Sequence, residues 1–230
     1  MENTVRLLST LALMGAVRSL AGKYEAEGGA RIDADFAPTL RLLDRLRDGE
    51  AADVVILTRE GLAGLAAKGS VVAESCVDLA SSFVGLAVKA GEAHPDIATE
   101  ATLRATLLRA RSIAYSGLGA SGIFFAQLIA KMGIAAEINA RATIVPQGFT
   151  AERLVSGEAD LAVQQISELK QVAGVDIVGP IPLHLQSAAV FSAGRLSASG
   201  KIDQSDRLLK FLASEEVVPA LRESGLEPCL

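Results

Sequence analysis

The sequence has few of the residues that build metal centres, disulfide frameworks and aromatic surfaces. Of its 230 residues, two are cysteine, two are histidine and none is tryptophan. Cys76 and Cys229 lie far apart, and neither has the CxxC or Cys/His spacing of a zinc site. We therefore expect no metal and no cofactor. A disulfide between the two cysteines would require the C-terminal tail to fold back on the first part of the chain.

Long apolar runs and basic clusters are also missing. No stretch approaches the roughly 18 consecutive apolar residues that a membrane-spanning helix needs. The formal net charge is −5, and the lysines and arginines are scattered along the chain. This charge distribution argues against a protein that binds nucleic acid electrostatically. We expect neither membrane insertion nor a nucleic-acid partner.

Residues 7–17 are apolar enough to resemble the hydrophobic region of a secretory signal. However, the segment before them carries an acid, Glu2, and a single base, Arg6, and no clean Ala-x-Ala cleavage site follows. We interpret this segment as the first strand and the first helix of the fold. The chain as given is then expected to be cytoplasmic, or periplasmic if a signal was removed or lies outside the given sequence.

Small aliphatic residues dominate, and half of all residues are hydrophobic. In the first 70 residues a strand, a turn and a helix follow one another three times, with strands expected at 5–8, 31–36 and 53–57. The continuous apolar run of the third strand is typical of a buried parallel sheet. After a long connection at 71–82, strands at 83–88, 112–115, 143–145 and 161–164 repeat this pattern with helices between them. The sequence predicts an α/β protein with two similar halves, each a mainly parallel sheet flanked by helices.

One stretch, from Ala114 to Gly122, combines a strand end, three glycines, two serines and a helix start. The first turn of a helix has unpaired N–H groups and favours negative charge. Ser121 is placed to cap this helix and to donate to a ligand. The stretch lacks the Gly-Lys-Ser/Thr of a nucleotide-binding loop and the Gly-x-Gly-x-x-Gly of a dinucleotide turn. It predicts either a cradle for a small anion or a well-capped strand-to-helix turn without a ligand.

Several phrases in the sequence resemble a known family. They are Gly-Glu-Ala-Ala-Asp-Val-Val-Ile at 49–56, Gly-Ala-Ser-Gly at 119–122, Val-Ser-Gly-Glu-Ala-Asp at 155–160, Gln-Ile-Ser-Glu at 165–168 and Gly-Pro-Ile-Pro at 179–182. The chain resembles the type 2 periplasmic-binding fold, in the group of molybdate-binding-like solute-binding proteins. This resemblance implies two lobes joined by two crossover hinge strands, with lobe I formed by 1–80 and 186–230 and lobe II by 81–185.

The resemblance also implies that the ligand is held at helix N-termini in a cleft between the lobes, by hydroxyl and backbone N–H donors. The positions carried over, together with nearby loop residues, are Thr10, Ala12, Pro38, Thr39, Ser116, Ser121, Gly122, Phe149 and Gln165. Ser121 and Gly122 match the family well. Ala12 and Gln165 depart from it, because a methyl and an amide stand where hydroxyls are expected. A carboxylate-bearing ligand is therefore at least as plausible as molybdate.

Two functions remain open. The first is a small-anion binding protein of the ABC-transporter type, monomeric, with an ABC permease as partner if it is exported. The second is an enzyme that resembles aconitate isomerase and moves a proton in a small tricarboxylate within the same fold. Such chemistry needs a base with a pKa near neutral and donors for the carboxylates.

Three residues are candidates for the proton transfer, and each has a plainer interpretation. Glu168 follows Gln165 by three residues and equally fits a helix-capping acid. His184 lies at the expected lobe crossing and equally fits a surface histidine. Tyr115 ends a buried strand and equally fits the core. No acid–base pair is recognisable from spacing, so the sequence favours the binding protein.

Overall fold

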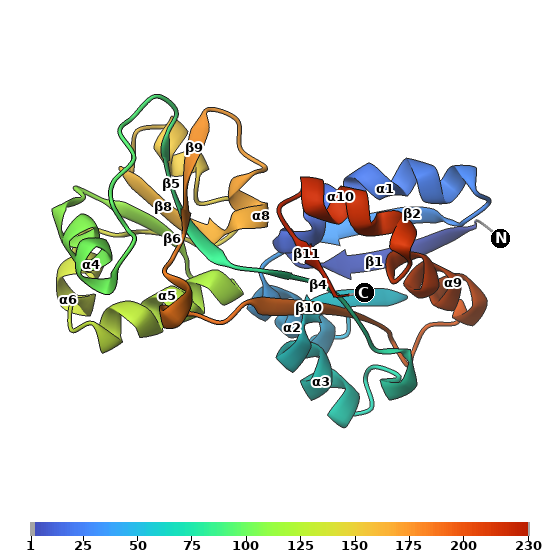
Figure 1. Cartoon of the computed structure of the whole chain (residues 1–230). Helices are drawn as coiled ribbons and strands as arrows, with labels where there is room; N and C mark the ends of the chain where they lie inside the picture. The colour runs from blue at the N-terminus through green and yellow to red at the C-terminus, as the bar shows by residue number, and fades with distance from the viewer. Residues whose placement is uncertain (1–2, 230) are drawn as a thin grey trace. The chain divides into compact units, whose positions relative to one another are not determined.

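The computed structural model describes residues 3–229 and divides them into two compact units. Unit 1 comprises the chain up to Ser81 and from Ala189 onward, and unit 2 is the continuous segment from Ser82 to Ala188. The boundaries expected from the sequence were 80/81 and 185/186. Figure 1 shows a sheet with helices on it in each unit, so the predicted α/β class is confirmed. No helix within residues 3–229 is both long and apolar enough to cross a membrane.

Unit 1 is built on a mixed six-stranded sheet. Its order is β11-β4-β10-β3-β1-β2, with β1 parallel to β2 and β3, and with β10 antiparallel to β3. The strands are β1 (Thr4–Ser9), β2 (Arg31–Phe36), β3 (Val54–Thr58), β4 (Val77–Ser82), β10 (Ala189–Arg195) and β11 (Glu227–Pro228). The helices are η1 (Leu11–Leu13), α1 (Met14–Ala26), α2 (Thr39–Arg47), α3 (Arg59–Ala67), η2 (Ala73–Ser75), α9 (Ile202–Leu212), η4 (Glu215–Val217) and α10 (Val218–Glu223).

The apolar run of β3 is buried on both faces of this sheet. Val54 and Ile56 pack into a core with residues of α1, α9 and α10. Val55 and Leu57 pack on the other face with Leu42 and residues of α3. Successive strand residues point to opposite faces, so a strand covered on both sides must be apolar throughout. The sequence pattern at 53–57 therefore has a direct structural cause.

Unit 2 repeats this plan with a five-stranded sheet of order β7-β6-β8-β5-β9. β6 is parallel to β7 and β8, and β5 is antiparallel to β8 and β9. The strands are β5 (Val84–Lys89), β6 (Ile113–Ser116), β7 (Thr143–Val145), β8 (Leu161–Gln165) and β9 (Val175–Pro180). The helices are α4 (Glu100–Arg109), α5 (Ala120–Lys131), α6 (Ala135–Asn139), α7 (Glu152–Val155), α8 (Ile166–Leu169) and η3 (Leu183–Leu185).

Two parts of the secondary structure differ from the expectation. The segment 71–82, expected to be a connection, contains β4, and the tail contains β11, which pairs antiparallel with β4. The tail therefore does fold back on the first part of the chain, and the N–H of Cys229 donates to the oxygen of Leu79 at 3.0 Å. Cys76 and Cys229 are nevertheless free and exposed. The two sheets are mixed rather than simply parallel, because β10 and β11 in unit 1 and β5 and β9 in unit 2 run antiparallel to their neighbours.

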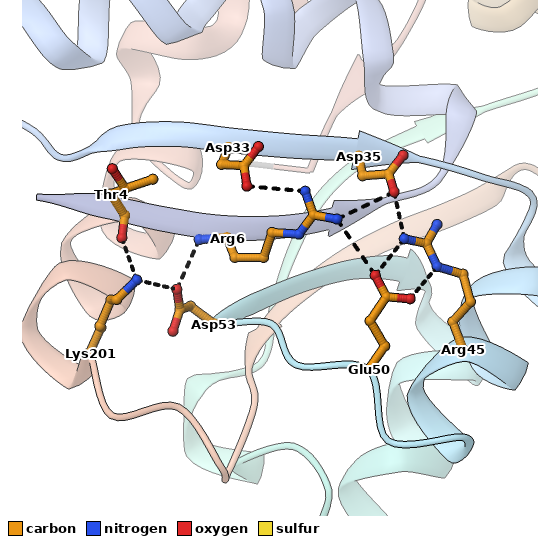
Figure 2. A network of polar contacts seen from close by, with 8 residues as sticks. All are labelled: Thr4, Arg6, Asp33, Asp35, Arg45, Glu50, Asp53 and Lys201. Carbon is orange, nitrogen blue, oxygen red and sulfur yellow. Dashed lines mark hydrogen bonds and ion pairs between the residues drawn. The ribbon is translucent and has the colours of Figure 1, made fainter. Parts of the chain in front are cut away.

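Charged side chains form a network on β1, β2, α2 and the loop before β3 (Figure 2). The Arg6 guanidinium lies 3.1 Å from Asp33, 3.4 Å from Asp35 and 3.5 Å from Glu50. Arg45 pairs with Asp35 and Glu50, at 2.5 Å each. The bond from Arg45 is the largest reason why the pKa of Glu50 lies below its ordinary value. These ion pairs fasten α2 to the edge of the unit 1 sheet.

Asp53 is the buried carboxylate of the same region. It accepts the Arg6 N–H at 2.8 Å and the Ser199 hydroxyl at 2.7 Å, and its other contact is the Lys201 ammonium at 3.3 Å. Lys201 also donates to the oxygen of Thr4 at 2.7 Å, as Figure 2 shows. Burial alone would raise the pKa of Asp53, but these bonds together hold it below its usual value. Asp53 thereby ties the segment before α9 to the start of β1.

Candidate functional site

The candidate site in unit 2 lies where three parallel strands end. β6 ends at Ser116, β7 at Val145 and β8 at Gln165, and β6 lies between the other two in the sheet. The N–H of Gly117 donates to the oxygen of Val145 at 3.0 Å, so the loops after β6 and β7 begin side by side. In α/β sheets this edge is where ligands commonly bind. The structure thus gathers the loops that contain Ser116, Ser121 and Phe149 at one edge of one sheet.

The turn from β6 into α5 is organised by Ser116. Its hydroxyl oxygen accepts the N–H of Gly119 at 2.9 Å and that of Leu118 at 3.4 Å. Gly119 is the N-cap of α5, and no side chain caps the helix. The expectation that Ser121 caps this helix is therefore wrong. Ser121 is instead the second residue of the helix, two positions after the N-cap.

Two glycines allow this turn to close tightly. A Cβ atom on Gly122 would lie 1.6 Å from the oxygen of Ser116, and one on Gly119 would lie 2.8 Å from the Ser116 hydroxyl. The approach at Gly122 is to backbone and excludes any side chain there, whereas a side chain at Gly119 would require the Ser116 hydroxyl to shift. The start of α5 therefore packs directly onto the end of β6.

The Ser121 hydroxyl is buried within this turn and makes no hydrogen bond to the described part of the chain. The residue is 1% exposed, and its oxygen has no hydrogen-bond partner in the described part of the chain. A buried polar group normally has a partner, and leaving it without one costs about 1–3 kcal/mol. α5 has 12 residues, so its first N–H groups carry the positive end of a full helix dipole. The turn thus offers a free hydroxyl together with a helix N-terminus, which is the chemistry of an anion site.

Gln165, predicted to contact the ligand, is used inside the protein. With its amide nitrogen turned toward the backbone, it donates to the oxygens of Ser82 and Phe83 at 3.2 Å each. Its side chain also accepts from the N–H of Glu168. The residue is 2% exposed. These bonds attach the end of β8 to the start of β5, and sequence reasoning could not detect them because the partners lie about eighty positions away.

Glu168 forms the other half of this capping arrangement. Its Oε2 accepts the N–H of Gln165 at 3.2 Å, which agrees with the capping interpretation given above. Burial raises the pKa of the Glu168 carboxyl to about 8, although hydrogen bonds from Gln165 and Gln164 act in the opposite direction. Glu168 is therefore a largely neutral acid at pH 7, located just beyond the carboxyl end of β8.

The other two proton-transfer candidates lie elsewhere in unit 2. The Tyr115 hydroxyl donates to Oδ1 of Asn139 at 2.7 Å, and its ring packs edge-on against Phe125 at 5.1 Å between centroids. Burial raises the pKa of Tyr115. His184 is exposed on η3. Of the three, only Glu168 directly follows one of the three parallel strands whose ends form the candidate site.

Unit 1 has its own set of predicted site residues. Thr10 follows β1, is 3% exposed, and its hydroxyl has no hydrogen-bond partner within residues 3–229. Ala12 is buried in η1 and presents only a methyl group. Pro38 is the N-cap of α2, and Thr39 is its buried first residue. Thr10 therefore repeats in unit 1 what Ser121 shows in unit 2, a buried hydroxyl without a partner in the segment that follows a parallel strand.

Acidic and metal-binding side chains do not cluster at either set. Within the described range, no three or more histidine, cysteine, aspartate or glutamate side chains are arranged to hold a metal ion. The donors that the structure leaves unpaired at these loops are hydroxyls. Such neutral donors suit an anion, because they supply hydrogen bonds without adding negative charge.

Comparison with known proteins shows which family the chain is similar to. A family model described as bacterial extracellular solute-binding protein matches residues 5–227. The chain is 36% identical to an aconitate isomerase from Pseudomonas sp. over 231 aligned residues, which cover 98% of this chain and 88% of that protein.

Solved structures show the same fold. The periplasmic molybdate-binding protein of Azotobacter vinelandii is similar with a TM-score of 0.81 and 16% identity, over 96% of this chain and 98% of that one. The sulfate-binding protein of Mycobacterium tuberculosis H37Rv gives a TM-score of 0.76 and 16% identity, over 98% and 87% of the two chains. The predicted type 2 periplasmic-binding fold is thereby confirmed, and the chain belongs to the bacterial extracellular solute-binding protein family.

Proposed function

We propose that the protein binds a small carboxylate-bearing anion, with the start of α5 as its central donor. The observation that carries this proposal is the Ser121 hydroxyl, which is buried and has no partner within residues 3–229. It lies in the first turn of a long helix, on a turn that Gly119 and Gly122 allow to close. A carboxylate oxygen would accept from this hydroxyl and from the unpaired N–H groups of the first turn.

The donor set favours a carboxylate over a bare tetrahedral oxyanion. The Gln165 amide of unit 2 is occupied by the backbone of Ser82 and Phe83, so it is not free to bond a further ligand oxygen. A planar carboxylate has two oxygens to satisfy, whereas a tetrahedral oxyanion has four. Within residues 3–229, unit 1 has an unpaired hydroxyl of the same kind in Thr10.

Binding assays with five defined anions test this proposal. The probes are cis-aconitate, trans-aconitate, citrate, sulfate and molybdate, measured by thermal shift and by titration calorimetry. At least one carboxylate should raise the melting temperature, and Ser121→Ala should weaken its binding about tenfold, since a hydrogen bond to a charged group is worth roughly 1.5–3 kcal/mol. The proposal fails if no carboxylate stabilises the protein.

Ser205→Ala is the matched control for Ser121→Ala. Ser205 is a fully buried serine in α9 of unit 1, and its hydroxyl also has no partner in the described residues. Removing it should leave the affinity for every probe unchanged. Equal losses in the two variants would mean that Ser121 acts through stability and not through the ligand.

A second candidate function is isomerisation of a small tricarboxylate. It is favoured by the similarity to an aconitate isomerase over nearly the whole chain. Moving a proton between carbons needs a group that both holds and releases a proton near neutral pH. Burial raises the pKa of Glu168 to about 8, which makes this residue our candidate for the proton-transferring group.

This candidate is tested by incubating the protein with cis-aconitate and following the trans isomer by NMR. Conversion should occur with the wild type and be lost in Glu168→Gln, while the variant still binds aconitate. A wild-type protein that binds aconitate without converting it would exclude the isomerase and leave the binding function standing.

A further inference from the structure

Gln164 has a side-chain amide that makes three hydrogen bonds to one turn. Its Oε1 accepts the Thr150 N–H at 2.7 Å and the Thr150 hydroxyl at 3.0 Å, and its Nε2 donates to the oxygen of Gly148 at 3.2 Å. Gln164 is 1% exposed and Thr150 is completely buried. The turn at 146–150 is thus held by hydrogen bonds to a side chain of β8, in addition to its own backbone.

This turn is a neighbour of the α5 start. It begins directly after Val145, which pairs with Ser116 in the sheet and accepts the Gly117 N–H. Within the turn, half-buried Phe149 lies between Gly148, whose φ is +89°, and buried Thr150. The turn therefore places an aromatic residue in the loop that starts beside the β6–α5 turn, which contains Ser121.

An aromatic residue beside an anion site affects which anions fit. A tetrahedral oxyanion presents oxygen on all sides, so an oxygen directed at a phenyl ring would lose its hydrogen bonds to water without gaining a donor. A di- or tricarboxylate can direct one carboxylate to the helix start and its carbon skeleton to the ring. The ring must be held in place for this discrimination to work.

We propose that Gln164 is a positioning residue, which fixes the Gly148-Phe149-Thr150 turn so that Phe149 forms an apolar wall selecting carboxylates with a carbon skeleton over bare oxyanions. This inference rests on the proposed anion site at the start of α5. Glu168, whose carboxyl interacts with the Gln164 side chain, supports Gln164 from the side of α8.

The first part of the test replaces the Gln164 amide with an apolar side chain of similar size. Gln164→Leu should raise amide hydrogen exchange at Thr150, whose N–H loses its acceptor, by at least tenfold. Ser112→Ala is the matched control, because the Ser112 hydroxyl donates to the oxygen of Arg141 at 2.8 Å from just before β6, at the opposite end of that strand. The control should leave exchange at Thr150 unchanged. Unchanged exchange in Gln164→Leu would overturn the positioning role.

The second part of the test measures selectivity as the ratio of the dissociation constants for sulfate and trans-aconitate. Gln164→Leu and Phe149→Ala should both reduce the preference for trans-aconitate, by roughly tenfold. Phe149→Leu, which keeps an apolar wall, should retain most of it. If Phe149→Ala leaves the ratio at the wild-type value, the wall does not exist and the inference is overturned.

The two parts of the test separate this inference from the function on which it rests. A wild-type protein that binds none of the carboxylate probes contradicts the proposed site and with it the wall, whereas the exchange measurement still decides the role of Gln164. A wild-type protein that binds trans-aconitate, together with variants of unchanged selectivity, leaves the function standing and overturns only the inference. If Gln164→Leu does not fold, the two Phe149 variants decide.

Discussion

Unit 1 and unit 2 share a plan of strands and helices but secure their polar groups differently. In unit 1, Arg6 and Arg45 share acidic partners, and Lys201 pairs with buried Asp53. In unit 2 the buried bonds are made by neutral amides and hydroxyls, above all those of Gln164, Gln165 and Gln186. The ion pairs Arg111–Asp160 and Arg153–Glu158 of unit 2 lie at more exposed positions.

This difference matters for how each unit can respond to its surroundings. Ion pairs weaken as the salt concentration rises or as their acids are protonated. Hydrogen bonds made by side-chain amides carry no net charge and are not weakened in these ways. Gln186 illustrates the neutral strategy, because its amide bonds both the N–H and the oxygen of Val84, at 2.9 and 3.0 Å. Unit 2 therefore holds the buried polar groups near its proposed anion site with neutral side chains, while unit 1 uses charge to hold its own helices.

The largest effect should come from a glycine in unit 2. Gly122→Ala places a Cβ 1.6 Å from the oxygen of Ser116, so α5 must move off β6. We expect a loss of about 4 kcal/mol or more in the free energy of unfolding, with loss of anion binding. Urea denaturation and titration calorimetry would measure the two effects.

Gly64→Ala in unit 1 provides the contrast. Gly64 also lies inside a helix, α3, but a Cβ there would meet nothing within 4 Å. Because alanine favours helix more than glycine does, this variant should be up to about 1 kcal/mol more stable than wild type. A comparable loss of stability in both variants would show that the close approach at Gly122 is not the cause.

The next largest effect concerns the neutral acid of unit 2. Since burial raises the pKa of Glu168 from 4.5 to about 8, the folded protein keeps the proton between these pH values while the unfolded chain releases it. The free energy of unfolding should therefore fall as the pH rises from 5 to 8. Glu168→Gln removes this loss, so the variant should gain on the order of 3 kcal/mol over wild type across that range.

Denaturation of both proteins at pH 5 and pH 8 measures this gain. The exposed residue Glu152, changed to glutamine, is the control and should follow the wild type. Parallel pH dependence of wild type and Glu168→Gln would contradict the neutral state of Glu168.

The smallest of the three effects concerns Asp53, the buried charged acid of unit 1, in contrast to the neutral Glu168 of unit 2. Asp53 has a lowered pKa, so its charged form stabilises the folded state above its unfolded pKa of 3.8, and this stabilisation is lost as the pH falls through the folded pKa. Asp53→Asn should cost about 2 kcal/mol at pH 7, because it leaves the Lys201 ammonium and the Arg6 N–H without a charged acceptor. The variant should also lose less stability than wild type on acidification below pH 4.

Thermal denaturation at pH 7 and pH 3 would report both parts of this prediction. Asp33→Asn is the control, since Asp33 pairs with the same Arg6 through a side chain that is 51% exposed. Exposed pairs contribute little, so its cost should stay below about 1 kcal/mol. Equal costs for the two aspartates would mean that burial of Asp53 adds nothing.

Local patterns were sufficient to predict most elements of the fold. The strand at 31–36 and that at 143–145 have the bounds expected from alternation and turn residues. β4 was missed because Val-Asp-Leu-Ala-Ser-Ser has neither a continuous apolar run nor a clean alternation, and because its partner β11 comes from the far end of the chain. Strand pairing between such distant segments leaves no local signal.

The candidate site was predictable only in part. The glycines and serines at 116–122 indicated the α5 turn, and Thr10 was carried over by position. The roles of Ser116 and Ser121 were not separable from sequence, because which serine bonds the turn depends on where the helix begins, and that differs by two residues from the expected cap. Gln165 was predicted to contact the ligand because the sequence does not reveal its backbone partners, which lie about eighty positions away.

The pairing of β11 with β4 has a consequence for how the chain is made. Unit 2 is one uninterrupted segment, whereas unit 1 needs β10, α9, α10 and β11 from the C-terminal part of the chain to complete its sheet and core. During synthesis from the N-terminus, β1, β2 and β3 can pair with one another, but β3 lacks β10 and β4 lacks β11 until residues 189–228 have been made. Unit 2 can fold meanwhile, so the order of assembly is the reverse of the order in which the two units begin.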